Sequence, residues 1–155
     1  MRGPIVTRSR LEATPEAVWE RVTSLEGIND EFGGWLRMTA PPEVRDAGLG
    51  GVEVGKRVCR SWILLFGLIP IDYDDITLVS LDPPRGFHER STMMSMRVWE
   101  HRRTIEPDGA GCVVTDAIGY EPRVPWPDIF MRPVYRLVFR LRHHRLRRRF
   151  GGAPA

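Results

Sequence analysis

The sequence has few cysteines, almost no lysine and no long apolar run, and each shortage narrows the class of protein. Cys59 and Cys112 fit no metal-binding spacing, so we expect two reduced, buried thiols. Lys56 is the only lysine, a bias that indicates coding composition rather than phosphate recognition. The longest apolar run, residues 62–71, is too short to cross a bilayer, and residues 1–10 lack the apolar segment of a signal peptide. We therefore expect a cytoplasmic protein.

Acidic residues are also absent after Asp128. That part of the chain instead carries eight arginines, namely Arg132, Arg136, Arg140, Arg142, Arg145, Arg147, Arg148 and Arg149. So basic a terminus is typical of proteins that dock on RNA, a ribosome or an anionic membrane. A solvated helix end explains the same charge, because cations are stabilised at the negative end of the helix dipole. We favour the solvated end, expect no nucleic-acid partner, and keep the anionic membrane as the weaker alternative.

What is present indicates one domain over residues 1–155. The apolar fraction of 42% argues against wholesale disorder, and a chain of 155 residues is long enough to bury a sizeable core. Gly151, Gly152 and Pro154 end the last helical pattern, so we expect a disordered tail over residues 151–155.

Residues 128–150 predict one long terminal helix, around which the rest of the chain is organised. Its apolar residues recur at helical spacing, which indicates a buried face. The predicted face consists of Phe130, Val134, Leu137, Val138 and Leu141, and it is widened by Tyr135, Phe139, Leu146 and Phe150. Pro133 predicts a kink or a late start, because proline lacks the donor that a helix interior needs.

Upstream, strand patterns dominate. Strands are expected at residues 4–13, 35–39, 56–66, 70–81, 86–94, 97–106 and 112–120, with a loop at 40–55. Thr14 caps a helix that extends to Ile28, and a short second helix follows at residues 29–32. Short turns between successive strands imply an antiparallel sheet. The predicted fold is α+β, a curved antiparallel sheet wrapped around the long C-terminal helix, with two short helices after the first strand and an apolar pocket between sheet and helix.

The late hairpin, with the turn PDGAG, carries the richest set of polar residues. If Glu106 pairs with Gly111, then His101 lies opposite Asp116. One face of the hairpin then presents Trp99, His101, Arg103, Asp116, Ile118 and Tyr120. A slip of one residue pairs Arg102 with Asp116 instead and sends His101 to the other face.

A histidine beside an aspartate is the arrangement of a general acid or base, whose imidazole the carboxylate orients. Arg103 beside them suits a carboxylate or a developing enolate on a substrate. The same three side chains also satisfy one another in a polar patch of the sheet or hydrogen-bond a ligand, and this is the interpretation we favour. A metal site built from His88, His101 and Asp116 matches no ligand spacing, so we expect neither a metal nor a cofactor.

Four segments also carry a resemblance to a known family. They are ATPEAVWERVTSLEGI, LVSLDPPRGF, VWEHRRTIEPDGAGCVVTDAIGYEP and FRLRHHRLRRRF. In this order they resemble the START-like, Bet v 1-like (SRPBCC) helix-grip superfamily, and within it the polyketide cyclase/dehydrase and lipid-transport group. The resemblance covers nearly the whole chain and implies a hydrophobic cavity that holds a small molecule. It implies no single chemistry. Arg103 stands where a second histidine often follows the first.

We therefore expect a binder of a small hydrophobic or polyketide-like molecule. The predicted cavity wall consists of Trp62, Tyr73, Trp99, Ile118, Tyr135 and Phe139, and the predicted polar anchors are His101, Arg103, Asp116 and Tyr120. The alternative is a cyclase or dehydratase with catalytic His101 and Asp116, in which Asp116 orients His101. A third possibility is an interaction protein that docks on RNA or a membrane through its arginine-rich end.

Overall fold

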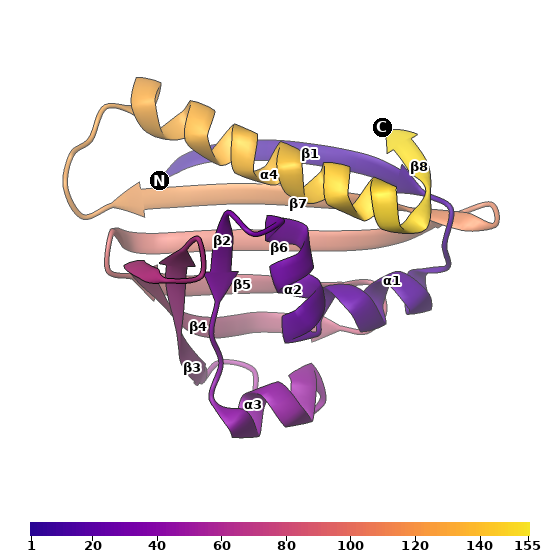
Figure 1. Cartoon of the computed structure of the whole chain (residues 1–155), viewed down its shortest axis with the longest axis horizontal. Helices are drawn as coiled ribbons and strands as arrows, with labels where there is room; N and C mark the ends of the chain where they lie inside the picture. Colours follow the sequence, from indigo (N-terminus) through magenta and orange to yellow (C-terminus); the bar gives the residue numbers. More distant parts are fainter.

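A computed structural model describes residues 1–49 and 51–155 of the chain as a curved antiparallel sheet wrapped around its helices (Figure 1). The strands are β1 (Arg2–Leu11), β2 (Leu36–Met38), β3 (Arg57–Leu65), β4 (Ile69–Asp82), β5 (Gly86–Met93), β6 (Met96–Asp108), β7 (Gly111–Pro122) and β8 (Gly152–Pro154). The helices are α1 (Pro15–Val22), α2 (Leu25–Phe32), α3 (Pro42–Ala47), the 3₁₀ helix η1 (Gly48–Gly51) and α4 (Asp128–Phe150). The predicted helix-grip fold is confirmed.

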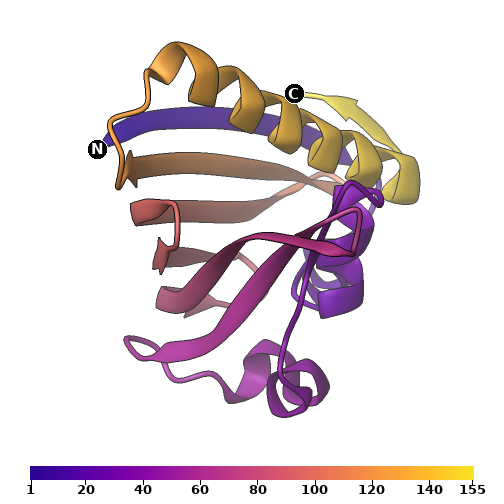
Figure 2. The same cartoon turned by 60° about the vertical axis from the view of Figure 1, so that its left-hand side comes forward.

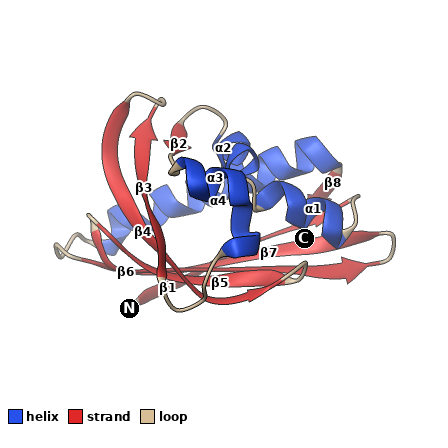
Figure 3. Ribbon diagram, turned by 90° about the horizontal axis from the view of Figure 1, so that it is seen from below, coloured by secondary structure: helices blue, strands red, loops and turns tan.

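The sheet follows the order β2-β3-β4-β5-β6-β7-β1-β8, so the first strand lies beside the seventh. Figure 3 shows the helices on one side of this sheet, with β3 and β4 curling up beside them. In Figure 2, α4 runs along the β1 and β7 edge, while α1 and α2 lie under its C-terminal half. The curvature of this single sheet therefore creates a concave side, and the helices cover that side.

The two N-terminal helices meet earlier in the chain than the sequence pattern suggested. Instead of one helix reaching Ile28, α1 ends at Val22 and α2 begins at Leu25. The Ser24 side chain caps α2 by accepting a hydrogen bond from the Gly27 amide at 3.0 Å. Gly27 also lies so close to the Arg21 carbonyl that a Cβ there would come within 1.7 Å of the oxygen. This close packing fixes the sharp angle between α1 and α2.

The terminal helix has the predicted bounds, but the predicted buried face is wrong. Phe130 is 65% exposed and Leu137 is 58% exposed, and Val134 and Leu141 also face solvent. The buried face consists of Phe139, Arg142, His143 and Leu146, with Tyr135 and Val138 half-buried. Hydrophobic periodicity missed this face because two of its positions are an arginine and a histidine, which are buried here with polar partners. The helix also begins at Asp128 and continues through Pro133, without the late start that the proline predicted.

Two expectations about loops also need correction. The tail is not disordered: Gly152–Pro154 form β8, which pairs antiparallel with β1 through Ser9, Arg10 and Leu11. Residues 40–55, expected to be a loop, contain α3 and η1. The short β8 covers part of the outer edge of β1, which otherwise would expose unpaired backbone groups.

Two clusters of buried apolar side chains hold the sheet and helices together. The first contains Ile5, Met93, Met96, Trp99, Ile118, Tyr120 and Phe139, and the second contains Leu11, Val18, Val22, Ile105, Cys112, Val114 and Leu146. α4 contributes to both, through Phe139 and Leu146. Full burial of each large apolar side chain stabilises the fold by roughly 1.5–3 kcal/mol. Cys59 and Cys112 are buried and unpaired, as expected.

Candidate functional site

A partly open cavity of about 150 Å³ lies between the concave side of the sheet and the helices. Its apolar lining comes from Val22, Ile28, Phe32, Met38, Leu49, Ile63, Ile76, Leu78, Phe87, Met93 and Trp99. Its polar lining comes from Thr23, Asp74, Glu89, His101 and Arg142. A mostly apolar wall with a few convergent polar groups is typical of a small-molecule site.

A larger open groove lies elsewhere on the surface, between α2 and the turn joining β3 to β4. Its volume is about 720 Å³, and its lining includes Glu26, Arg37, Arg45 and Asp46. Because this groove is more open to solvent and is lined by charged side chains, it suits an apolar molecule less well. The smaller, mostly apolar cavity is the better candidate site.

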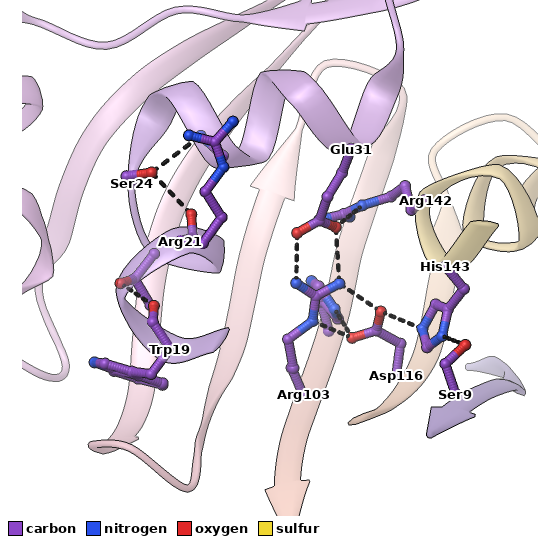
Figure 4. A network of polar contacts seen from close by, with 12 residues as sticks. Ser9, Trp19, Arg21, Ser24, Glu31, Arg103, Asp116, Arg142 and His143 are labelled. Carbon is purple, nitrogen blue, oxygen red and sulfur yellow. Dashed lines mark hydrogen bonds and ion pairs between the residues drawn. The ribbon is translucent and has the colours of Figure 1, made fainter. Parts of the chain in front are cut away.

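A buried cluster of charged residues, which we call the charged cluster, forms the floor beside the cavity: Glu31, Arg103, Asp116, Arg142 and His143 (Figure 4). Arg103 is 1% exposed and lies between two carboxylates. It donates to both oxygens of Glu31, at 2.8 and 2.9 Å, and to both oxygens of Asp116, at 2.7 and 2.6 Å. Such paired, bidentate contacts are the strongest that arginine makes.

α4 completes the charged cluster from the opposite side. Arg142 Nε donates to Glu31 Oε2 at 2.9 Å. The His143 ring bridges two strands, with Nε2 2.9 Å from Asp116 Oδ2 and Nδ1 2.9 Å from the Ser9 hydroxyl. The cluster therefore connects α2, α4, β1, β6 and β7 through polar contacts that are shielded from water.

The arginines of this cluster keep both carboxyl groups ionised. Burial by itself raises the pKa of Asp116, but the charge of Arg103 and that of His101 outweigh it and hold this pKa well below its usual value. Burial likewise opposes ionisation of Glu31, whose pKa is nevertheless lowered by Arg103 and Arg142. Within the charged cluster, two arginines therefore balance two carboxylates.

His101 connects this cluster to the cavity. Its Nε2 lies 2.8 Å from Asp116 Oδ1, and because an ionised carboxylate only accepts, Nε2 carries the proton. The other ring nitrogen, Nδ1, lies 3.9 Å from Glu89 Oε2 in the cavity wall. Phe87 and Phe139 contact the ring edge to face, with centroids 5.1 and 5.3 Å away. The imidazole is thus fixed in position with one nitrogen on the cavity side.

The hairpin register differs from the prediction by two residues. Asp108 pairs with Gly111 around a two-residue turn, so that Arg103 lies opposite Asp116 and His101 lies opposite Ile118. A shift of two keeps every side chain on the predicted face, and all six residues assigned to that face are buried. The contact between His101 and Asp116 is therefore diagonal across the ladder.

The predicted wall residues separate into two groups. Trp99, Tyr135 and Phe139 pack together, with the Trp99 ring 5.3 Å from Tyr135 and 6.5 Å from Phe139. Trp99 alone of these lines the cavity. Trp62, at 41% exposure, and Tyr73 lie instead against each other, and Arg60 covers the Tyr73 ring at 4.0 Å. These two do not line the cavity, because their strand positions place them on the other face from Ser61 and Asp74.

The remaining predicted anchors lie beneath the cavity surface. Ile118 and Tyr120 belong to the first apolar cluster, and the Tyr120 hydroxyl donates to Asp128 at the start of α4. Burial, followed by Asp128, raises the pKa of Tyr120 to about 12. Arg103 does not line the cavity either, since its donors are taken up by Glu31 and Asp116. Arg103 is therefore not placed to contact a molecule in this cavity.

Sequence reasoning missed three acidic residues of this region: Glu31, Asp74 and Glu89. Asp74 is 3% exposed, and its Oδ1 has no hydrogen-bond partner among the described residues. Burial, then repulsion by Glu89, raises the pKa of Asp74 well above its usual value. The alternation of Asp74 with Ile76 and Leu78 was the available signal, because period-two spacing places all three on the inner face.

Comparisons with known proteins support the fold. The structure superposes on protein CV1439 from Chromobacterium violaceum with a TM-score of 0.72 at 13% identity, covering 97% of this chain and 99% of that one. It superposes on a START superfamily protein from Mycobacterium smegmatis with a TM-score of 0.68 at 10% identity, covering 96% and 97%. DynU16, from the dynemicin biosynthetic locus, gives 0.61 at 14% identity, covering 96% of this chain and 47% of that one.

These likenesses confirm the START-like, Bet v 1-like helix-grip fold. No helix in the described part of the chain is both long and apolar enough to cross a bilayer. A search of curated protein sequences found no match. The family model that matches residues 9–150 is described as a domain of unknown function, DUF8410, and the chain belongs to this family.

Proposed function

We propose that the protein binds a small, largely apolar molecule in the cavity between the sheet and the helices. The observation that carries this proposal is the lining of the cavity, in which apolar side chains from strands and helices surround most of a space of about 150 Å³. An apolar cavity of roughly this size accepts a molecule as large as benzene without rearrangement. Its polar groups give such a ligand an orientation.

The similar structures support this proposal only through their shared fold. The ligand chemistry has to come from the residues of this chain. The wall offers Trp99 and Phe87 for stacking, while His101 and Asp74 offer hydrogen bonds. A ligand larger than the cavity requires α1 and α2 to move away from the sheet, and a polyketide-like molecule belongs to that class.

An enzymatic function is the alternative, and one observation favours it. His101 is held by Asp116 through Nε2, and Nδ1 of the neutral imidazole is an acceptor on the cavity side. A dehydratase or cyclase acting on a carbonyl compound needs one such base. Turnover of a model polyketide that is lost in His101→Gln, with binding of toluene retained, would favour this alternative.

Native mass spectrometry of the freshly purified protein tests the binding proposal. We expect an added mass from a small co-purified molecule, released under mild denaturation. Ile76→Phe fills the cavity from β4 and should remove the added mass. Val79→Phe makes the same kind of change on the exposed side of the same strand and should leave it in place.

A protein that purifies without any added mass and takes up neither toluene nor a larger apolar probe would contradict the proposal. Equal loss of the added mass in Val79→Phe would also contradict it, because that side chain does not line the cavity.

A further inference from the structure

Two carboxyl groups share one wall of the cavity. Asp74 comes from β4 and Glu89 from the neighbouring strand β5, and both residues are buried. The Ser91 hydroxyl donates to Glu89 Oε1 at 2.7 Å, which orients that carboxyl group. Asp74 Oδ1 has no hydrogen-bond partner in the described part of the chain. A buried polar atom without a partner is costly, so this oxygen either carries a proton that Asp74 shares with Glu89 or accepts a hydrogen bond from a ligand.

These two acids differ from every other buried acid of the interior. Glu31 and Asp116 each pair with arginine, at 2.8 and 2.6 Å respectively. No arginine or lysine of the described residues pairs with Asp74 or Glu89. The His101 ring, whose Nδ1 lies 3.9 Å from Glu89 Oε2, carries no positive charge when only Nε2 is protonated. Arg142 also lines the cavity, but its Nε is committed to Glu31. The wall therefore holds an excess of negative charge.

We propose that the ligand of this cavity carries a basic nitrogen, which Asp74 and Glu89 bind as a cation. This inference rests on the proposed binding function and adds the ligand class. An ammonium group supplies both the donor that Asp74 Oδ1 lacks and the positive charge that the acid pair lacks. The apolar body of the amine would then contact Trp99, Phe87 and the aliphatic lining.

A neutral hydroxyl group is the rival polar group, since it also donates a hydrogen bond. It brings no positive charge, so one carboxyl group has to keep its proton. Burial and Glu89 already favour that proton, because they raise the pKa of Asp74 well above its usual value. An ammonium group replaces the proton with a charge that both carboxyl groups contact, and a comparison of amine and alcohol affinities separates the two.

Three probes of similar size test this inference by calorimetric titration: toluene, benzyl alcohol and benzylamine, which is protonated at pH 7. We expect benzylamine to bind about tenfold or more tightly than benzyl alcohol, as a charged hydrogen bond implies. Asp74→Asn should weaken benzylamine binding by about tenfold and leave toluene binding unchanged. Asp75→Asn removes the same charge from the neighbouring position, where Asp75 binds Arg60 outside the cavity, and should change neither affinity.

The outcomes separate the inference from the proposed function. If toluene binds and benzylamine binds no more tightly than benzyl alcohol, the basic ligand is wrong and the binding function remains. If none of the three binds, both are wrong. Glu89→Gln provides the second variant if Asp74→Asn does not fold, and unchanged benzylamine affinity in a folded Glu89→Gln protein overturns the inference.

A separate observation concerns the solvent side of α4. Phe130, Val134, Leu137 and Leu141 follow helical spacing and are all exposed, and we call them the outer stripe. Trp126 and Ile129 extend the stripe at the start of the helix, with exposures of 59% and 75%. In Figure 1, this helix lies along the upper edge of the molecule, with one side free of other elements. A contiguous exposed apolar stripe marks an interaction surface.

Unpaired arginines flank this stripe. Arg136, Arg140, Arg148 and Arg149 are exposed and form no ion pair among the described residues, and no acidic residue follows Asp128. A second copy of the chain would bring two such basic helices together, which like-charge repulsion opposes. RNA would use the arginines but not the apolar side chains. An anionic lipid surface uses both.

We infer that the outer stripe of α4 docks on an anionic membrane surface. Vesicles of phosphatidylcholine, with and without about one third phosphatidylglycerol, test this in a flotation assay. We expect binding to the anionic vesicles alone, lost in Phe130→Ser with Leu137→Ser and weakened severalfold in Arg136→Gln with Arg140→Gln. Arg90→Gln with Arg97→Gln removes the same charge from the opposite part of the sheet and should bind normally.

Absence of binding to anionic vesicles would overturn this inference. Equal weakening in Arg90→Gln with Arg97→Gln would also overturn it, because net charge rather than α4 would then explain the binding. RNA binding or self-association that needs α4, without vesicle binding, would assign the outer stripe to those partners instead.

Discussion

His101 and Asp116 contact each other diagonally: Nε2 lies 2.8 Å from Oδ1, although His101 pairs across the ladder with Ile118. Both side chains are buried, so the contact is shielded from water. In a double-mutant cycle of His101→Ala and Asp116→Ala, we expect a coupling energy of about 0.5–3 kcal/mol in unfolding. Asp116→Ala should cost more alone, because Arg103 and His143 also lose their acceptor.

The neighbouring strand pair, β5 and β6, offers a control for that cycle. His88 Nε2 lies 2.8 Å from Glu100 Oε1 on the other face of the sheet, where both side chains reach solvent. We expect a coupling energy below about 1 kcal/mol for this pair. Equal coupling energies at the two pairs would contradict the importance of burial.

Arg103 is the centre of the charged cluster, and its removal should be costly. Arg103→Met keeps most of the volume but leaves Glu31 and Asp116 without their shared partner. We expect a loss of about 3–5 kcal/mol in the free energy of unfolding, measured by denaturant titration at pH 7. Arg103→Lys keeps the charge but not the bidentate contacts. Its free energy of unfolding should lie between that of the parent protein and that of Arg103→Met. A loss below about 1 kcal/mol in Arg103→Met would show that the cluster does not stabilise the fold.

The raised pKa of Asp74 predicts an unusual pH dependence of the free energy of unfolding. Because burial and Glu89 raise the pKa of Asp74 well above its usual value, its contribution to stability is complete below about pH 4 and is lost as the pH rises through the folded-state pKa. Asp74→Asn removes this loss. The variant should therefore match the parent near pH 3.5 and exceed it at about pH 7–8, in the free energy of unfolding.

Asp75→Asn should show the opposite sign. The hydrogen bond from Arg60 lowers the pKa of Asp75, so that its contribution is present above about pH 4 and lost as the pH falls. The substitution should therefore be neutral in acid and destabilising near pH 7. The same sign for both variants would contradict the inward position of Asp74.

The cost of replacing an arginine near the end of α4 should depend on the contacts of its side chain rather than on its position in the sequence. Arg148 and Arg149 are exposed, and replacing both by Gln should cost about half a kcal/mol or less, through the helix dipole. Arg142→Gln should cost about 1–3 kcal/mol, because Glu31 loses a charged donor inside the protein. Arg145 and Arg147 contact Asp30 and Ser9, so the expectation of a solvated end from Arg145 to Arg149 was too broad.

The order of elements could be predicted from the sequence because it depends on local signals. Thr14 and Pro15 mark the start of α1, and the alternation along β6 and β7 places Trp99, His101 and Asp116 on one face. The register could not be predicted, because PDGAG allows turns of different lengths and the shift of two residues leaves the face unchanged. The face of the sheet on which a side chain lies is therefore a safer prediction than the residue with which it pairs on the next strand.

The candidate site was harder to predict, because its burial depends on contacts between distant segments. Glu31 lies in a polar stretch of α2 and becomes buried only because Arg103 and Arg142 reach it from β6 and α4. Phe139 was placed at the margin of the helical face that includes Leu137, yet Phe139 is the buried residue. A prediction based on the spacing of apolar residues does not place Arg142 and His143 on the inner face, because the partners of these two side chains lie elsewhere in the chain.

The most direct test of the binding account is a toluene titration of the ¹⁵N-labelled protein, followed by ¹H–¹⁵N correlation spectra. We expect saturable shifts at the amides of residues that line the cavity, such as Val22, Ile63 and Trp99, and no such shifts in Ile76→Phe. Shifts that do not saturate, or that cluster at the outer stripe of α4 and persist in Ile76→Phe, would contradict the claim that the cavity is the binding site.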